Sequence, residues 1–180
     1  MNRLLFATLL VVALLSSPAF GGEPFPDIVL GGEMPSVYRV YLETNKTPPK
    51  LSDVAAPYLL IYFFNVYCEQ CAKDIPSVNK VFELLDGQGF SSRIKMLGLG
   101  VNNSQFEINF FRNKYSVPMP CFPLQDPIAK LHHVDPEHPN YVLVYLNRNK
   151  KLETIFHKET PITTAENLTT EVLRAAGYGN

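Results

Sequence analysis

Three short runs of the chain are rich in apolar residues and have the length of β-strands. They cover residues 58–64 (YLLIYFF), 94–101 (IKMLGLGV) and 141–146 (YVLVYL). The first run is unbroken, which is typical of a central strand buried on both faces of a sheet. Residues 152–157 follow the third run after a short turn and predict its hairpin partner. A looser alternation over residues 37–42 predicts an edge strand.

Between these runs the apolar residues recur at helical spacing. A helix ending near Gly87 is predicted by Ile75, Val78, Phe82 and Leu85. Asn103 and Ser104 can cap a second helix that carries Phe106, Phe110, Phe111 and Tyr115. A short helical piece is expected at 128–132, and a last helix at 163–176 with Gly177 as its stop. Strands that alternate with helices predict an α/β fold with a mixed, mostly parallel sheet between helices.

The first 21 residues have the pattern of a secretory signal peptide. A basic start precedes an apolar run of about 12 residues, and Ala19 and Gly21 place small side chains before a cut. The run is shorter than the roughly 20 residues of a membrane span. The alternative to a signal peptide is a buried N-terminal helix. The expected organisation is a signal peptide at 1–21, an extended lead-in at 22–36 and one domain at 37–180. No stable membrane insertion is expected after the signal is removed.

Composition narrows the functional classes. The 16 basic residues nearly balance the 17 acidic ones, so the charge gives no reason to expect nucleic acid as a partner. The three cysteines are two close neighbours, Cys68 and Cys71, and a distant Cys121. An exported domain held together by disulfides normally has more cysteines, in an even number. This distribution favours chemistry at the close pair.

A Cys-x-x-Cys placed directly after a buried strand and at the start of a helix suits redox chemistry. The unpaired N–H groups and the dipole of the helix N-terminus favour a thiolate on Cys68, the expected nucleophile. Cys71, one turn further, would resolve a mixed disulfide. Two alternatives remain open. Zinc would need two further ligands and no second cysteine pair exists, while a structural disulfide across so small a loop would add little stability.

The stretch from Tyr67 to Pro76 resembles the active-site turn of the TlpA/ResA-like branch of the thioredoxin superfamily. The shared features are an aromatic residue before Cys-x-x-Cys, an acidic residue three positions after the second cysteine, and an aliphatic residue followed by proline. Three further segments resemble the same family in the same order: 51–53 (LSD), 122–126 (FPLQD) and His138–Pro139. The resemblance implies a thioredoxin-like three-layer sandwich, with a central mixed sheet and helices on both faces.

The resemblance also implies a set of residues around the cysteine pair. The expected active-site support consists of Tyr67, Glu69, Gln70, Asp74, Pro76, His138 and Pro139. Asp74 would relay a proton to Cys71, with a solvated residue in the first turn of the helix as the alternative. Pro139 would be a cis proline facing the disulfide. Three positions depart from the family pattern: Tyr67 stands where the family usually has Trp, Asp74 where it usually has Glu, and His138 where Thr or Val is commoner. Tyr62 stands at the position of a buried Asp in cytoplasmic thioredoxins.

The function implied by the resemblance is an exported thiol:disulfide oxidoreductase, periplasmic or secreted. It would reduce disulfides of protein substrates such as apocytochrome c, would be re-reduced by a membrane donor of the DsbD or CcdA type, and would need no cofactor or metal. One rival is a Sco-like copper carrier, in which His138 would join the two sulfurs. That class has one more residue between its cysteines.

A second rival is a peroxiredoxin-type peroxidase. That class has Thr three positions before the reactive cysteine, where this chain has Asn65. Cys121 is expected in a loop flanked by prolines, as a buried small apolar residue, with a third redox thiol or a partner-linking site as the alternative. His138 could also stabilise the Cys68 thiolate as an imidazolium, and the alternative is an exposed histidine in a loop.

Overall fold

The structure is a computed structural model that describes residues 22–125, 138–159 and 161–179. The expected signal peptide at 1–21 and the expected helix at 128–132 lie outside these residues. The described part contains one sheet with the strand order β1-β6-β5-β2-β3-β4. Its strands are β1 (Glu23–Phe25), β2 (Tyr58–Phe64), β3 (Ile94–Val101), β4 (Cys121–Leu124), β5 (Asn140–Leu146) and β6 (Leu152–Lys158).

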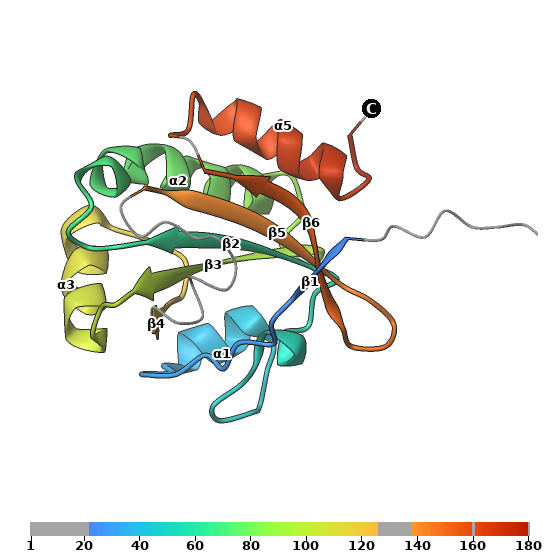
Figure 1. The fold of residues 1–180 in the computed structure, drawn as a ribbon, viewed down its shortest axis with the longest axis horizontal. Coiled ribbons are helices and arrows are strands. Elements are labelled where there is room, and N and C mark those ends of the chain that lie inside the picture. The colour runs from blue at the N-terminus through green and yellow to red at the C-terminus, as the bar shows by residue number, and fades with distance from the viewer. Residues whose placement is uncertain (1–21, 126–137, 160, 180) are drawn as a thin grey trace, which may run out of the picture.

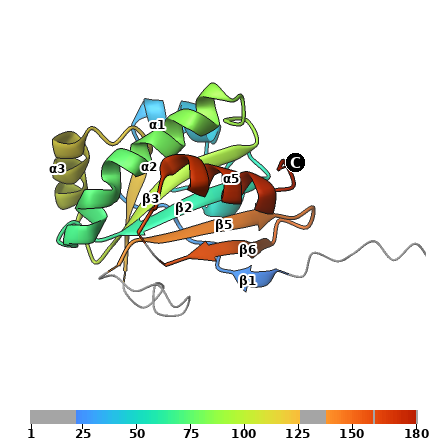
Figure 2. The ribbon, with the colours of Figure 1, turned by 90° about the horizontal axis from the view of Figure 1, so that it is seen from above.

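Helices cover both faces of this sheet (Figures 1 and 2). They are α1 (Ser36–Leu42), α2 (Glu69–Gly87), α3 (Gln105–Tyr115) and α5 (Ala165–Ala175), with a 3-10 turn at Leu51–Asp53. The core on one face holds buried residues of α2, α3 and α5, whereas the core on the other face holds those of α1 and the 3-10 turn. The expected three-layer α/β architecture is therefore confirmed.

The central strand β2 supplies both cores. Leu60, Tyr62 and Phe64 face α2, while the alternate residues Leu59, Ile61 and Phe63 face α1. Side chains of a strand point to opposite faces in turn, so a strand covered on both sides has to be apolar throughout. The unbroken run at 58–64 is explained by this position.

The sheet is mixed and mostly parallel, as expected: β2, β3, β4 and β6 run in one direction, and β5 and β1 run in the other. The pairs β2–β3 and β3–β4 are parallel, whereas β1–β6, β6–β5 and β5–β2 are antiparallel. The antiparallel pairs around β5 arise because β5 runs opposite to both of its neighbours, β2 and β6.

Three local expectations from the pattern are wrong or incomplete. Residues 37–42 form helix α1 rather than an edge strand, with Tyr38 and Leu42 buried one turn apart. Cys121, expected in a loop, begins the edge strand β4. The lead-in contains β1, and its Phe25 and Leu30 are buried in the core on the α1 side.

The other helix limits follow the sequence signals. Helix α2 ends at Gly87, and α3 begins after Ser104, which forms a reciprocal capping box with Glu107. Thr164 caps α5, and Gly177 follows that helix with a φ of 80°. Within the described ranges, none of the helices combines the length and the apolar character needed to cross a membrane.

Candidate redox site

The turn that carries the cysteine pair joins the centre of the sheet to helix α2. Asn65 follows β2 directly; its Oδ1 accepts the backbone N–H of Tyr67 at 2.9 Å, and its Nδ2 donates to the carbonyl of Val101 at 2.9 Å. The backbone N–H of Val66 donates to Oδ1 of Asn103 at 3.0 Å. An asparagine that bonds the backbone two residues on is a typical turn former. The bond between Tyr67 and Asn65 shapes the turn, and the other two bonds fix it to the end of β3.

Cys68 and Cys71 form a disulfide, with their Cα atoms 5.2 Å apart. Cys68 is the N-cap of α2, and its Sγ accepts the backbone N–H of Cys71 at 2.9 Å. Cys68 is 8% exposed, whereas Cys71 is fully buried. In the reduced state the free N–H groups and the dipole of this helix end stabilise negative charge on the outer sulfur.

The residue before the pair, Tyr67, is largely exposed, and its hydroxyl donates a hydrogen bond to Glu107 of α3. This bond raises the pKa of Tyr67. It also lowers the pKa of Glu107 to about 2, together with the hydrogen bonds that Glu107 accepts from Ser104. Glu107 was not among the expected site residues, although the pattern Ser-x-x-Glu at 104–107 is a recognisable capping box.

The two residues between the cysteines face different surroundings. Glu69 is exposed and pairs with Lys73 one turn on, at 2.7 Å, and this hydrogen bond and charge lower the pKa of Glu69. The half-buried Gln70 donates from Nε2 to Oδ1 of Asp74 at 2.8 Å. The dipeptide thus presents one side chain to solvent and one to the buried carboxylate.

Asp74 is buried and lies one turn after Cys71. In addition to Gln70, its Oδ2 accepts the hydroxyl of Tyr141 at 3.0 Å and the backbone N–H of Ile162 at 3.2 Å. A buried carboxylate is stable only when such donors surround it. All three contacts use Asp74 as an acceptor, and they connect α2 to β5 and to the segment before α5.

Two stacked tyrosines lie beneath the cysteine pair. Tyr62 of β2 and Tyr141 of β5 are opposite each other in the sheet, with ring centroids 5.2 Å apart. The hydroxyl of Tyr62 donates to the backbone carbonyl of Cys71 at 3.2 Å. Burial raises the pKa of both hydroxyls. Tyr141 was missed by sequence reasoning because it belongs to an apolar run and carries no motif.

The remaining expected residues are more scattered. Pro76 lies inside α2 on its exposed side. His138 is exposed and its carbonyl accepts Nδ2 of Asn140 at 2.9 Å, while Pro139 is buried. The cis peptide bond found in the described residues is Thr47–Pro48, so the expected cis bond at His138–Pro139 is wrong.

No family model and no curated protein matches the sequence. Several solved structures match its fold. A Chlorobium tepidum protein assigned as the thiol:disulfide interchange protein DsbE has a TM-score of 0.57 at 20% identity, over 86% of this chain and 96% of that one. A thiol:disulfide interchange protein of Bacteroides sp. has a TM-score of 0.57 at 14% identity, over 85% and 88%. A thioredoxin-related protein of Neisseria meningitidis has a TM-score of 0.55 at 19% identity, over 74% of this chain and 96% of that one.

Likeness at these identities establishes the fold. The chain has the thioredoxin-like fold.

In this thioredoxin-like sandwich, Cys121 is a free, buried thiol whose pKa is raised to about 12 by burial. The expectation of a small buried residue at Cys121 is confirmed. Across the described ranges, His, Cys, Asp and Glu nowhere gather in threes that could hold a metal ion.

Proposed function

We propose that this thioredoxin-like protein is a thiol:disulfide oxidoreductase that acts through Cys68 and Cys71. The observation that carries the proposal is the placement of the two sulfurs. The outer one caps a helix and reaches the surface, and the inner one is buried within bonding distance. The names of the Chlorobium and Bacteroides structures, which describe thiol:disulfide interchange, add support.

The reaction exchanges one disulfide for another. The Cys68 thiolate attacks one sulfur of a substrate disulfide, a mixed disulfide forms, and the other substrate sulfur leaves as a thiolate that takes up a proton. Cys71 then loses its proton and attacks Sγ of Cys68, which releases the second substrate sulfur. The substrate gains two electrons and two protons, and the protein pair becomes oxidised. The reverse sequence oxidises a substrate dithiol.

The buried groups around Cys71 would assist the second step. Asp74 lies one turn beyond Cys71 and is held by Gln70 and Tyr141. We assign it the acceptance of the Cys71 proton, as the family resemblance implies. Tyr62 fixes the backbone of Cys71 through its carbonyl and so holds the inner thiol in line with Cys68.

The site of action in this proposal is outside the cytoplasm, because the first 21 residues have a signal-peptide pattern. The family resemblance favours reduction of protein disulfides, for example in apocytochrome c during cytochrome c maturation. A membrane donor of the DsbD or CcdA type would then restore the dithiol. The sulfurs themselves carry the electrons, so the exchange needs no organic cofactor.

A redox titration against glutathione, with insulin reduction followed in parallel, tests the proposal. We expect Cys68→Ser to abolish exchange and Cys71→Ser to accumulate a mixed disulfide visible by mass spectrometry. A potential below about −260 mV indicates a reductant, whereas one near −120 mV indicates an oxidant. A reduced protein whose two thiols fail to react with disulfides at neutral pH contradicts the proposed function.

A further inference from the structure

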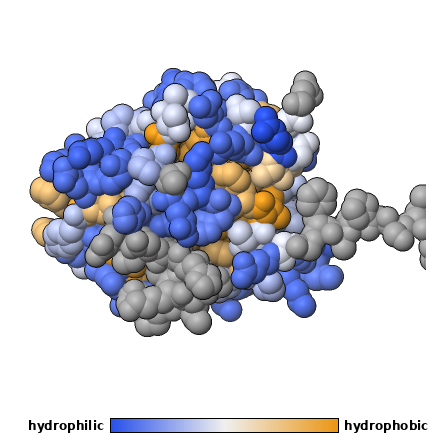
Figure 3. All heavy atoms as spheres, turned by 45° about the horizontal axis from the view of Figure 1, so that its top comes forward, coloured by the Kyte–Doolittle hydropathy of each residue, from blue (hydrophilic) through white to orange (hydrophobic). Residues whose placement is uncertain are grey.

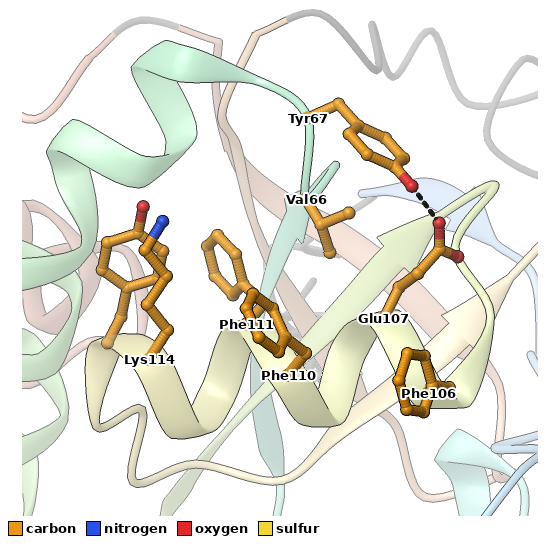
Figure 4. A pocket seen from close by; sticks show the side chains of 8 residues that line it. Val66, Tyr67, Phe106, Glu107, Phe110, Phe111 and Lys114 are labelled. Atoms are coloured by element: carbon orange, nitrogen blue, oxygen red, sulfur yellow. Dashed lines mark hydrogen bonds between the residues drawn. The ribbon is translucent and has the colours of Figure 1, made fainter.

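An apolar groove runs along α3, beside the turn that carries Cys68. Its volume is about 270 Å³. Val66 and Tyr67 form one wall, and α3 contributes Phe106, Phe110, Phe111 and Lys114 (Figure 4). Since residues 66 and 67 directly precede Cys68, the groove is continuous with the redox turn.

The groove is bordered by large apolar side chains that the fold leaves uncovered. Phe106 is 80% exposed and Phe110 is 64% exposed, one turn apart on α3, and Tyr67 faces them from the turn. Figure 3 shows apolar surface at the left edge of the molecule, the end at which α3 lies. Neighbouring exposed aromatic side chains are typical of a surface that binds another molecule.

The two ends of the groove differ in charge. At one end, the carboxylate of Glu107 accepts hydrogen bonds from the hydroxyl groups of Tyr67 and Ser104. At the other end, the ammonium group of Lys114 lies 5.0 Å from the centre of the Tyr115 ring. No carboxylate of the described residues pairs with Lys114. The groove therefore offers an apolar floor and a positive charge at the end away from Tyr67.

We propose that this groove binds an extended segment of the protein substrate, with a large apolar side chain next to its disulfide and an acidic side chain about three residues away. From Glu107 to Lys114 the helix rises by roughly 10 Å, at 1.5 Å per residue. An extended chain covers that length in about three residues. The inference rests on the proposed function, because the substrate is the molecule that has to reach Cys68.

The occupant is a substrate segment rather than a second copy of the chain because the groove and the redox turn share a wall. A polypeptide whose disulfide lies at Cys68 places its neighbouring residues against Val66 and Tyr67, without any further movement. A permanent self-contact at the same place would compete with substrate for this surface.

Model disulfide peptides test the inference. The probe is Glu-x-x-Phe-Cys-x-x-Cys-Phe-x-x-Glu with Ser or Gly at x, which covers both chain directions, and two matched probes replace Phe by Ser or Glu by Lys. The reduced full-length protein is mixed with each probe and with hydroxyethyl disulfide, a substrate too small to reach the groove. Rates are compared for wild type, Phe106→Ser/Phe110→Ser, Lys114→Glu and the control Val37→Ser/Val40→Ser. The control residues are similarly exposed, on α1 across the sheet.

We expect the double phenylalanine variant to reduce the Phe probe about tenfold more slowly, a loss of roughly 1.4 kcal/mol, and to keep the wild-type rate with hydroxyethyl disulfide. Lys114→Glu should reverse the preference between the Glu and Lys probes, and the α1 control should behave as wild type. Equal slowing of the probe and the small disulfide, or no slowing of either, overturns the inference. So does a dimer in light scattering that the double variant abolishes, because the groove is then a self-contact.

Failure of the proposed function gives a different result. A wild-type protein that cannot reduce hydroxyethyl disulfide contradicts exchange at Cys68, and the groove is then tested alone. Fluorescence anisotropy measures the oxidised protein binding a labelled Phe probe whose cysteines are replaced by serine. Binding that the double phenylalanine variant loses supports the groove as a peptide site, and absence of binding overturns it.

Discussion

The hydroxyl of Tyr141 donates a hydrogen bond to the buried carboxylate of Asp74 at 3.0 Å, although 66 residues separate them in the sequence. The bond joins the helix that carries the cysteine pair to strand β5 of the sheet. Tyr62, the neighbour of Tyr141 across the sheet, donates to the carbonyl of Cys71. Two stacked tyrosines thus hold successive turns of α2 from below.

Replacing Tyr141 by Phe should lower the free energy of unfolding by about 2 kcal/mol, because the hydrogen bond to a buried carboxylate is lost. Tyr62→Phe removes a bond to a neutral carbonyl and should cost about 1 kcal/mol. Both variants keep the stacked rings. Urea unfolding of the oxidised proteins measures the two differences. A Tyr141→Phe cost no larger than that of Tyr62→Phe would contradict the assigned importance of the Asp74 bond.

The fold was predictable where a segment's burial determines its sequence. Strand β2 is covered on both faces and contains only aliphatic and aromatic residues. The limits predicted for it, 58 and 64, agree with the structure. The segment 37–42 was wrongly predicted as a strand because valines such as Val37 and Val40 favour strands. Both are exposed on a helix that buries Tyr38 and Leu42.

Pairings between distant segments were harder to predict from the sequence. Pro120 and Pro123 made the surroundings of Cys121 resemble a loop, yet an edge strand tolerates proline on its unpaired side. The direction of β5 against β2 depends on the path of the connecting chain, which periodicity does not report.

At the site, the cysteine pair could be found from the sequence because strand, motif and helix are contiguous. Tyr67 and Asp74 could also be named, from their spacing to the cysteines. The bond of Asp74 to Tyr141 could not, because the two residues meet only through the register of β2 with β5. Asn65 has a readable signal, an asparagine at the end of a strand, whose role in bonding Tyr67 and Val101 follows from the fold alone.

Glu107 should make the protein more stable above pH 4 than below it. Its pKa in the folded protein is about 2, mainly because the Tyr67 hydroxyl donates to it, whereas an unfolded glutamate titrates near 4.3. The stabilisation is complete above the unfolded value and is lost as the pH falls through 4 toward 2. Melting temperatures of wild type and Glu107→Gln should therefore differ at pH 6 and converge near pH 2. Tyr67→Phe should weaken the same pH dependence; an unchanged profile in that variant would contradict the assigned cause.

Cys121 should be inert in the folded protein. Burial raises its pKa to about 12, so almost no thiolate forms at pH 8. Iodoacetamide should label the reduced native protein at Cys68 and should label Cys121 only after denaturation, as peptide mass spectrometry would show. Cys121→Ala should keep the wild-type rate of insulin reduction. Rapid labelling of Cys121 in the native state would contradict the burial of its thiol.

Gly98 in β3 should not tolerate a side chain. A Cβ at this position would lie 2.7 Å from Sγ of Cys121 and 3.0 Å from Cε1 of Phe64. Crowding of this kind in a packed core costs about 1–3 kcal/mol, so Gly98→Ala should be destabilised by that amount in urea. Cys121→Ala removes the nearer atom and should recover part of the loss in the double variant. Strict additivity of the two changes would mean that the sulfur is not the obstacle.

Asn65 should control both the rigidity of the redox turn and the acidity of Cys68. Asn65→Ala loses the bonds to Tyr67 and Val101 and should cost about 1–3 kcal/mol of stability. Asn65→Asp keeps the acceptor for Tyr67 but adds a negative charge near the thiolate, which should raise the pKa of Cys68.

The pH dependence of iodoacetamide labelling at Cys68, measured on the reduced proteins, separates the two effects. Its midpoint should move to higher pH in Asn65→Asp by more than in Asn65→Ala, because only the aspartate repels the thiolate. Asn79→Ala is the matched control, since Asn79 also joins secondary-structure elements through backbone carbonyls, those of Tyr115 and Ser116. It should lose stability and leave the labelling midpoint in place. A midpoint that moves equally in the control would mean that loss of stability, and not charge beside the turn, sets the acidity of Cys68.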